Sequence, residues 1–266
     1  MTTTTDRQDL RRALDMDRRL LSAAAQHADE HPLGVALHNP ALPRVWVQNQ
    51  LHVLGPAGDI DDLVRILDDL YGDLKHRRAV LEDEAEGERL AQGFADRGWL
   101  VNRTVYMALR EPRDREPAAG RAREVDEATL RPVEARMIAA EPHGNDPEVV
   151  EQLLGQRAAL HRAADACRYV AGCDGDELVG TTTLYRSGEL AQVEDVITAQ
   201  SRRGRGIARA MVSLAIDLAG DADLIWIAAD DEDWPKELYF KLGFRPMGRT
   251  VSFTLVGPEH PSHHPG

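Results

Sequence analysis

The sequence predicts a mixed α/β fold in which helices flank a mostly antiparallel sheet. The first observation is that residues 122–256 alternate short apolar runs with stretches of helical period. The second is a composition of 42% apolar and 29% charged residues among 266, which allows a buried core under a soluble surface. The third is the pair Asp174-Gly175 between two apolar runs, which predicts a hairpin turn.

The elements expected in this part follow one another closely. Apolar residues at helical spacing predict helices over 125–140, 147–164, 206–219 and 234–242. Short apolar runs predict strands over 168–172, 178–185, 190–198, 224–229 and 251–256. Gly220 suits the end of the third helix, and Pro235 suits the first turn of the fourth.

A charged stretch at 111–121, which contains Pro and Gly and has no apolar period, predicts a linker. The part before it looks like a shortened copy of the part after it. Residues 103–109 echo 249–255, and residues 69–73 echo 217–221, in the same order. The expected segments are a domain at 1–110, a linker at 111–121, a domain at 122–256 and a disordered tail at 257–266.

Composition narrows the class of partner. The chain has 32 basic and 45 acidic residues and a net charge of −13, which argues against nucleic acid and permits cationic substrates. The two cysteines, Cys167 and Cys173, exclude a disulfide framework or a multi-thiolate zinc site and are expected to be reduced. Neither a signal peptide nor a membrane-spanning run is visible, so we expect a cytoplasmic protein without a membrane partner.

The strongest local signal is the Gly- and Arg-rich turn at 202–206, between the strand at 190–198 and the helix at 206–219. Glycines let backbone N–H groups point outward, and a helix N-terminus adds partial positive charge, so a pyrophosphate fits here. The spacing matches neither the dinucleotide fingerprint nor a Walker loop. The alternative is a basic loop whose glycines serve turn geometry alone.

This turn and the segment 238–244 together resemble the GNAT superfamily of acyl-CoA-dependent N-acyltransferases. The turn fits the signature Gln/Arg-x-x-Gly-x-Gly/Ala, and the later segment fits Tyr-x-x-x-Gly-Phe. The matching residues are Arg203, Gly206 and Ala208 in the first motif and Tyr239, Gly243 and Phe244 in the second. The resemblance covers about 122–256 and implies two tandem GNAT-like copies, of which the N-terminal one is degenerate.

The resemblance implies a sheet that splits open near its middle and holds acetyl-CoA there, with the pyrophosphate on the turn. The implied cofactor-binding residues are Val196, Ile197, Thr198, Arg203, Gly204, Arg205, Gly206, Ile207, Ala208 and Arg209. Where the repeat places the turn, the N-terminal copy has Pro56 and Gly58 followed by Asp59, so it is not expected to bind CoA.

Two residues are candidates for catalysis. The resemblance makes Tyr239 the acid that protonates the leaving thiolate; the alternative is a core tyrosine beneath Phe244. With period two, Gln192, Glu194, Val196 and Thr198 share one face, so Glu194 is the expected base, directly or through water, and Asp195 points to the opposite face. The alternative is a surface carboxylate, and a bulge would overturn this face assignment.

The sequence departs from many relatives at Glu232 and Pro235, where Asn and Ala are common. The acidic run at 230–233 binds a cationic acceptor or is a solvated loop with Asp233 as the helix cap. His143 lies where relatives build the acceptor pocket, and the sequence favours the alternative of a turn histidine without a role.

The sequence therefore predicts an N-acyltransferase that uses acetyl-CoA to acylate a small-molecule primary amine by direct attack, with no metal. We allow for a homodimer. One rival is a peptide or protein N-acetyltransferase, and another is a non-catalytic acyl-CoA-binding regulatory module.

Overall fold

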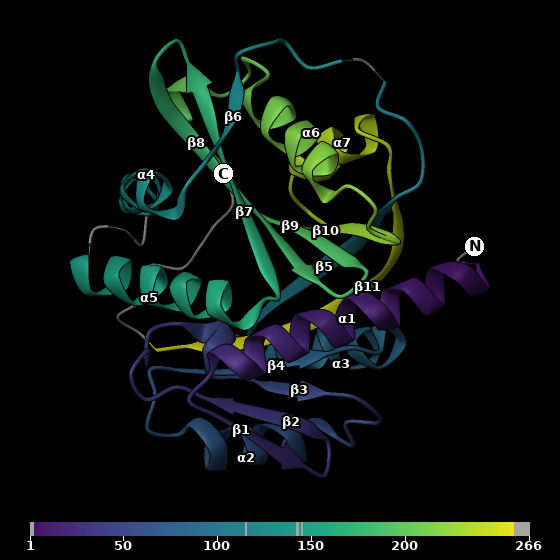
Figure 1. Ribbon diagram of the computed structural model, residues 1–266. Coiled ribbons are helices and arrows are strands. Elements are labelled where there is room, and N and C mark those ends of the chain that lie inside the picture. Colours follow the sequence, from purple (N-terminus) through teal and green to yellow (C-terminus); the bar gives the residue numbers. More distant parts are fainter. Residues whose placement is uncertain (1–2, 115, 142–143, 145, 258–266) are drawn as a thin grey trace. The chain divides into compact units, whose positions relative to one another are not determined.

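The computed structural model of the protein describes residues 3–114, 116–141, 144 and 146–257 (Figure 1). Contacts divide these residues into two compact units. Unit 1 holds the described residues up to Tyr106, residues 229–233 and those from Met247 onward, and unit 2 holds the rest. His143 and the expected tail at 257–266, except for Gly257, lie outside the described residues.

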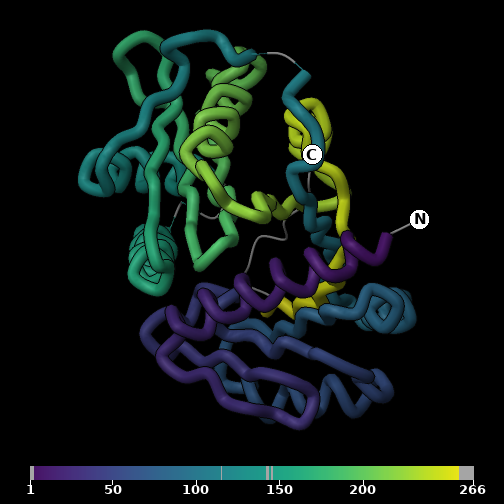
Figure 2. Tube along the Cα trace, turned by 45° about the vertical axis from the view of Figure 1, so that its right-hand side comes forward, coloured from purple at the N-terminus to yellow at the C-terminus, as the bar shows by residue number. Residues whose placement is uncertain are grey.

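Unit 1 is a sheet with helices on both faces. Its elements are α1 (Thr4–Ala24), β1 (His27–His31), β2 (Gly34–His38), η1 (Trp46–Gln48), β3 (Leu51–Val53), α2 (Ile60–Tyr71), β4 (His76–Leu81), α3 (Glu84–Asp96), most of β5 (Leu100–Leu109) and the end of β11 (Phe244–Val256). Strand β3 runs parallel to β4, and the pairs β1–β2, β2–β3 and β4–β11 are antiparallel. Helix α1 crosses the strands on one face (Figure 2).

Unit 2 contains the elements that were predicted in most detail. They are β6 (Ala122–Val125), α4 (Glu127–Ala139), α5 (Pro147–Ala163), β7 (Ala166–Asp174), β8 (Glu177–Ser187), β9 (Leu190–Thr198), η3 (Gln200–Arg202), α6 (Ile207–Ala219), most of β10 (Leu224–Asp230) and α7 (Pro235–Lys241). Strands β6 to β9 are antiparallel and β10 runs parallel to β9. Helices α4 and α5 cover one face of β7–β9, and α6 covers the other (Figures 1 and 2). The predicted mixed α/β class is confirmed.

The segment predicted as a linker is held within unit 2. The N–H groups of Arg110 and Glu111 donate to the carbonyl of Gly243, and Arg113 donates to the carbonyl of Ser213 on α6. Gly243, with φ of 92°, needs to be glycine, because a Cβ there would lie 1.9 Å from the Glu111 carbonyl oxygen. Residues 111–114 therefore run against α6 and the end of α7.

Strand β11 is longer than the predicted 251–256. It begins at Phe244, and its part from Val251 to Val256 pairs with β4 in unit 1. The contact units therefore differ from the consecutive segments 1–110 and 122–256, which remain a prediction about independently folding domains. In the described part of the chain, no helix combines the length and apolar character needed to cross a bilayer.

Candidate functional site

The turn between β9 and α6 has the geometry of an anion cradle. Gly204 and Gly206 adopt φ values of 75° and 78°, in the left-handed region that favours glycine. Gly206 is the N-cap of α6 and supplies no side-chain hydrogen bond to the helix. A Cβ at either glycine would meet no atom within 4 Å, so the outer surface of the turn is open. The first N–H groups of α6 are therefore available to an anion.

The arginines around this turn differ in what they contact. Arg203 is exposed; its Nε donates to the carbonyl of Thr198 at 3.3 Å, and its Nη2 lies 3.6 Å from Glu141. Arg205 is exposed and lies 3.0 Å from Asp174. Arg209 is buried, and its guanidinium pairs with Asp114 at 2.6 Å. Arg209 can therefore serve the turn only through its backbone N–H.

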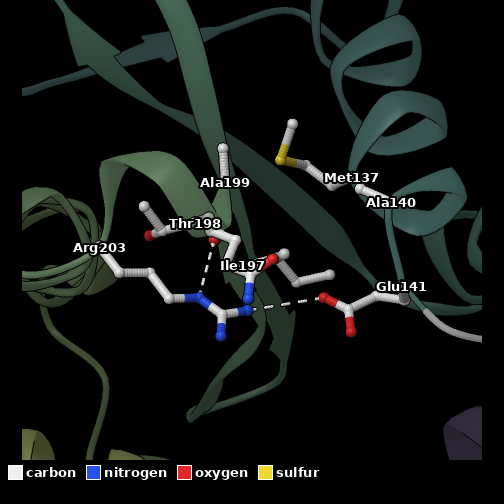
Figure 3. Close-up of a pocket in the computed structure, with 8 residues that line it drawn as sticks. Met137, Ala140, Glu141, Ile197, Thr198, Ala199 and Arg203 are labelled. Carbon is white, nitrogen blue, oxygen red and sulfur yellow. Dashed lines mark hydrogen bonds and ion pairs between the residues drawn. The ribbon is translucent and has the colours of Figure 1, made fainter.

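A cavity of about 310 Å³ adjoins the turn (Figure 3). Its lining residues are Met137, Ala140, Glu141, Ile197, Thr198, Ala199, Gln200 and Arg203. One wall is thus the end of α4, and the other is the end of β9 with the turn. The Thr198 hydroxyl oxygen is buried and has no hydrogen-bond partner among the described residues. Because that oxygen is buried, the charged groups that the cavity offers to a ligand are those of Glu141 and Arg203.

A bulge interrupts β9 next to this cavity. Glu194 pairs with Thr183 and Ile197 with Thr181, so two residues of β9 stand opposite Thr182 alone. The extra residue reverses the alternation of side chains between the two faces of β9. Ile197, and not Val196, is therefore the next residue on the face that carries Glu194. The predicted common face of Gln192, Glu194, Val196 and Thr198 is therefore wrong beyond Glu194.

Asp195 is the residue at the centre of the bulge, with φ of 56°. Asp tolerates the left-handed region better than most residues. Its carboxylate accepts a hydrogen bond from Arg157 of α5 at 2.6 Å, and Arg157 lies 3.3 Å from Glu134 of α4. Asp195 thus turns toward the helices α4 and α5. Its predicted orientation, opposite to Glu194, is wrong, because the bulge rotates the backbone at this position.

The cluster of Arg157, Asp195 and Glu134 was not predicted. Burial raises the pKa of Glu134, although Arg157 opposes that shift. Burial would lower the pKa of Arg157, but Asp195 and Glu134 outweigh it and raise that pKa. Burial and the nearby Asp195 hold the pKa of Tyr185 well above its usual range. The three charges therefore favour the ionised guanidinium between two carboxylates.

A sequence signal for this cluster exists in helical spacing. Arg157 stands three residues from both Leu154 and Leu160, on the buried side of α5. Glu134 similarly stands between Leu130 and Met137 on the buried side of α4. A charged residue on each of two apolar stripes indicates a buried ion pair.

The two catalytic candidates lie on different elements of unit 2. Glu194 is half-buried, and its Oε2 accepts a hydrogen bond from Gln192 at 2.9 Å. The described pairing of β9 with β10 ends at Val193, so the edge of β9 from Glu194 onward is not paired with β10. Tyr239 of α7 is 5% exposed. Its ring packs against the ring of Phe244 in an edge-to-face arrangement, with the ring centroids 6.2 Å apart.

The acidic run at 230–233 is tied to arginines of unit 1. Asp231 pairs with Arg249 at 2.7 Å, and Glu232 lies 3.6 Å from Arg103. The N-cap of α7 is Trp234, without a side-chain cap, so the prediction of Asp233 as the cap is wrong. These ion pairs favour a structural loop over a site for a cationic acceptor.

Comparisons with known proteins agree with this geometry. The family model described as Acetyltransferase (GNAT) family matches residues 134–244. A functionally unknown conserved protein from Staphylococcus epidermidis ATCC 12228 is similar in fold, with a TM-score of 0.65 and 12% identity over 86% of this chain and 93% of that one. A GCN5-related N-acetyltransferase from Kribbella flavida has a TM-score of 0.61 and 18% identity over 93% and 96%. The chain therefore carries an acetyltransferase domain of the GNAT family at residues 134–244.

Proposed function

We propose that this protein is an N-acyltransferase that moves an acetyl or other short acyl group from acyl-CoA to a primary amine of a small molecule. The observation that carries the proposal is the open turn at Gly204 and Gly206, whose backbone leads into the uncapped N-terminus of α6 beside a cavity. The edge of β9 that is not paired with β10 beyond Val193 supports it.

These residues suit a pyrophosphate followed by an extended polar arm. The N–H groups of Ile207, Ala208 and Arg209, with the side chains of Arg203 and Arg205, would hold the pyrophosphate. The edge of β9 from Val196 to Thr198 would hydrogen-bond the pantetheine arm. Acetyl-CoA, when bound, supplies an acyl group activated as a thioester.

The chain's own groups then divide the proton transfers. Glu194 would accept a proton from the amine, directly or through water. The Val196 N–H would donate to the acyl oxygen as negative charge develops there. Tyr239 would give its proton to the departing sulfur. A carbon–nitrogen bond forms, a carbon–sulfur bond breaks, and the thiolate leaves as a thiol.

The remaining parts of the proposal concern context. We propose two tandem GNAT-like copies, of which unit 2 contains the acyl-CoA site, in a cytoplasmic protein. The net charge of −13 supports a small cationic amine over nucleic acid as the partner. Neither a metal nor a membrane is needed for the chemistry, and a homodimer is compatible with it.

Release of CoA thiol, measured over a panel of small amines and peptides and without acceptor, tests the proposal. Turnover on a small amine supports it. Turnover on peptide amines alone would replace it with a protein acetyltransferase. Tight acetyl-CoA binding without turnover on any amine would replace it with a regulatory module.

Arg203→Glu is expected to weaken acetyl-CoA binding at least tenfold, or about 1.4 kcal/mol, because it replaces a cation beside the pyrophosphate with an anion. Titration calorimetry measures this. Arg202→Glu is the matched control, since Arg202 pairs with Asp174 and Glu177. Equal affinities for wild type and Arg203→Glu would remove the turn from the acyl-CoA site.

Glu141→Gln is expected to strengthen acetyl-CoA binding about two- to fivefold, or about 0.4–1 kcal/mol, the range of an exposed ion pair. Glu141 now competes with the pyrophosphate for Arg203, at 3.6 Å. Glu177→Gln removes a partner of Arg202 instead and should leave the affinity unchanged. A weaker affinity in Glu141→Gln would show that the carboxylate orients Arg203 and does not compete for it.

A further inference from the structure

The sheet of unit 1 has two chemically different faces. Ala79 and Leu81 of β4 and Phe253 of β11 belong to an apolar core with α2 and α3. Because side chains alternate along a strand, Arg78 of β4 and Thr254 of β11 lie on the other face, where they are cross-strand partners. This second face carries polar side chains beside the apolar Val80 of β4, and we call it the polar face.

Arg78 on this polar face has only neutral hydrogen-bond partners. Its Nε donates to Oε1 of Gln50 at 2.8 Å, and its Nη1 donates to the Thr254 hydroxyl at 2.7 Å. Among the described residues, no carboxylate pairs with Arg78. A guanidinium has five N–H groups, so three of them have no protein partner in that part of the chain. Burial lowers the pKa of Arg78 to about 10.

Other arginines of unit 1 show that carboxylates are not scarce. Arg18 pairs with Glu82 at 2.6 Å, Arg77 with Asp68 at 2.9 Å and Arg103 with Glu88 at 2.6 Å. The whole chain has more acidic than basic residues. Arg78 is half-buried, so the missing counter-charge costs more there than at an exposed position.

The neighbours of Arg78 hold it in place. The side-chain oxygen of Gln50 accepts a hydrogen bond from Arg78. The amide nitrogen of Gln50 therefore lies 3.0 Å from Nε2 of His52 and donates a hydrogen bond to that ring nitrogen. Nδ1 of His52 then carries the proton and lies 3.4 Å from Glu82, which already pairs with Arg18. The Glu82 carboxylate is therefore already paired with Arg18 and His52. Gln50 and Thr254 orient the Arg78 guanidinium, but neither of them neutralises its charge.

A second polar group on the same face also lacks a partner. Ser252 lies two residues before Thr254 on β11, so both side chains are on the polar face. Ser252 is 2% exposed, and its hydroxyl oxygen has no hydrogen-bond partner among the described residues. A buried hydroxyl and a charged fork with spare donors thus occupy neighbouring positions.

We propose that Arg78 binds an oxyanion, the carboxylate or phosphate group of a small ligand, in unit 1. The planar fork of N–H groups in the guanidinium matches two oxygens of such a group. The negative charge of the oxyanion supplies the counter-charge that no described carboxylate gives to Arg78. Ser252 supplies a further hydrogen bond. The site belongs to the N-terminal unit and is independent of the acyl-CoA turn in unit 2.

The test follows the Nε–H signals of arginine by NMR in the full-length wild-type protein. Sodium acetate and sodium phosphate are titrated separately, with sodium chloride holding the ionic strength constant. We expect the Arg78 signal, assigned by its loss in Arg78→Gln, to shift and saturate at millimolar concentrations of acetate, phosphate or both. Acetate alone identifies a carboxylate site, and phosphate alone identifies a phosphate site.

Matched variants complete the experiment. Arg65 is exposed and paired with Asp62, so acetate and phosphate should shift its Nε–H signal no more than sodium chloride does. The variant Arg65→Gln should bind the anion like wild type. Arg78→Lys keeps the charge without the fork and should bind at least about tenfold more weakly. The proposal is overturned if neither anion gives a saturable shift at Arg78, or if Arg65 responds equally.

Discussion

Arg157→Met is expected to lower the free energy of unfolding by about 3–5 kcal/mol, the cost of removing one partner from a buried ion pair. The Arg157 side chain is 8% exposed and contacts Asp195 at 2.6 Å and Glu134 at 3.3 Å. Methionine fills much of the same volume but leaves two carboxylates that repel each other in a poorly solvated place. Urea unfolding followed by circular dichroism measures the loss.

The matched control is Arg162→Met on the same helix. Arg162 is exposed, so its replacement should change stability by no more than about 0.5 kcal/mol. Asp195→Asn keeps a residue that tolerates the left-handed backbone, and combined with Arg157→Met it should recover part of the loss, since one repelling charge is gone. A loss in Arg157→Met no larger than in Arg162→Met would contradict the prediction.

This ion pair also bears on the proposed chemistry. Asp195 holds its φ of 56° at the bulge that precedes Val196, the proposed donor to the acyl oxygen. The ion pair between Asp195 and Arg157 of α5 thus fixes the backbone next to Val196, and with it the direction of the Val196 N–H. Loss of Arg157 should therefore lower kcat even in conditions where the variant remains folded.

Local pattern was sufficient to predict most elements of unit 2. The strand at 190–198 was predicted with the bounds it has, because turn residues flank one apolar run. The helix after Gly206 ends at Ala219, where Gly220 adopts φ of 59°. The predicted turn and the resemblance to GNAT proteins likewise depended on residues close together in sequence.

The failures came from contacts between distant residues. The prediction assumed that side chains alternate strictly between the two faces of the strand. An extra residue breaks that alternation without changing the apolar pattern, so the bulge at Asp195 could not be inferred from the sequence. The pairing of β11 with β4 joins residues far apart in the chain, and nothing local at Val251 marks that partner. The hydrogen bonds of residues 110–114 to Gly243 and α6 also join distant parts of the chain, while the assignment of 111–121 as a linker between domains stays a prediction.

Tyr239→Phe is expected to lower kcat about 10–100-fold with little change in acetyl-CoA affinity, the pattern of an interaction made in the transition state. A phenol has a reference pKa near 10 and can donate at neutral pH, while a thiol of pKa about 8.5 needs modest help to leave. General acid catalysis is worth about 10²–10⁴-fold, and the weak basicity of a thiolate favours the lower end. Steady-state kinetics over several acetyl-CoA concentrations separates kcat from affinity.

The structure makes the competing interpretation concrete, because Tyr239 is buried and its ring contacts Phe244. Phenylalanine keeps that ring contact, so a purely structural tyrosine predicts unchanged kcat. Tyr71→Phe is the matched control: Tyr71 is a fully buried tyrosine of unit 1 whose hydroxyl lacks a partner among the described residues, and its loss should leave kcat unchanged. If Tyr239→Phe turns over like wild type, the proton for the thiolate comes from water or another residue, and the hydroxyl of Tyr239 has no part in the chemistry.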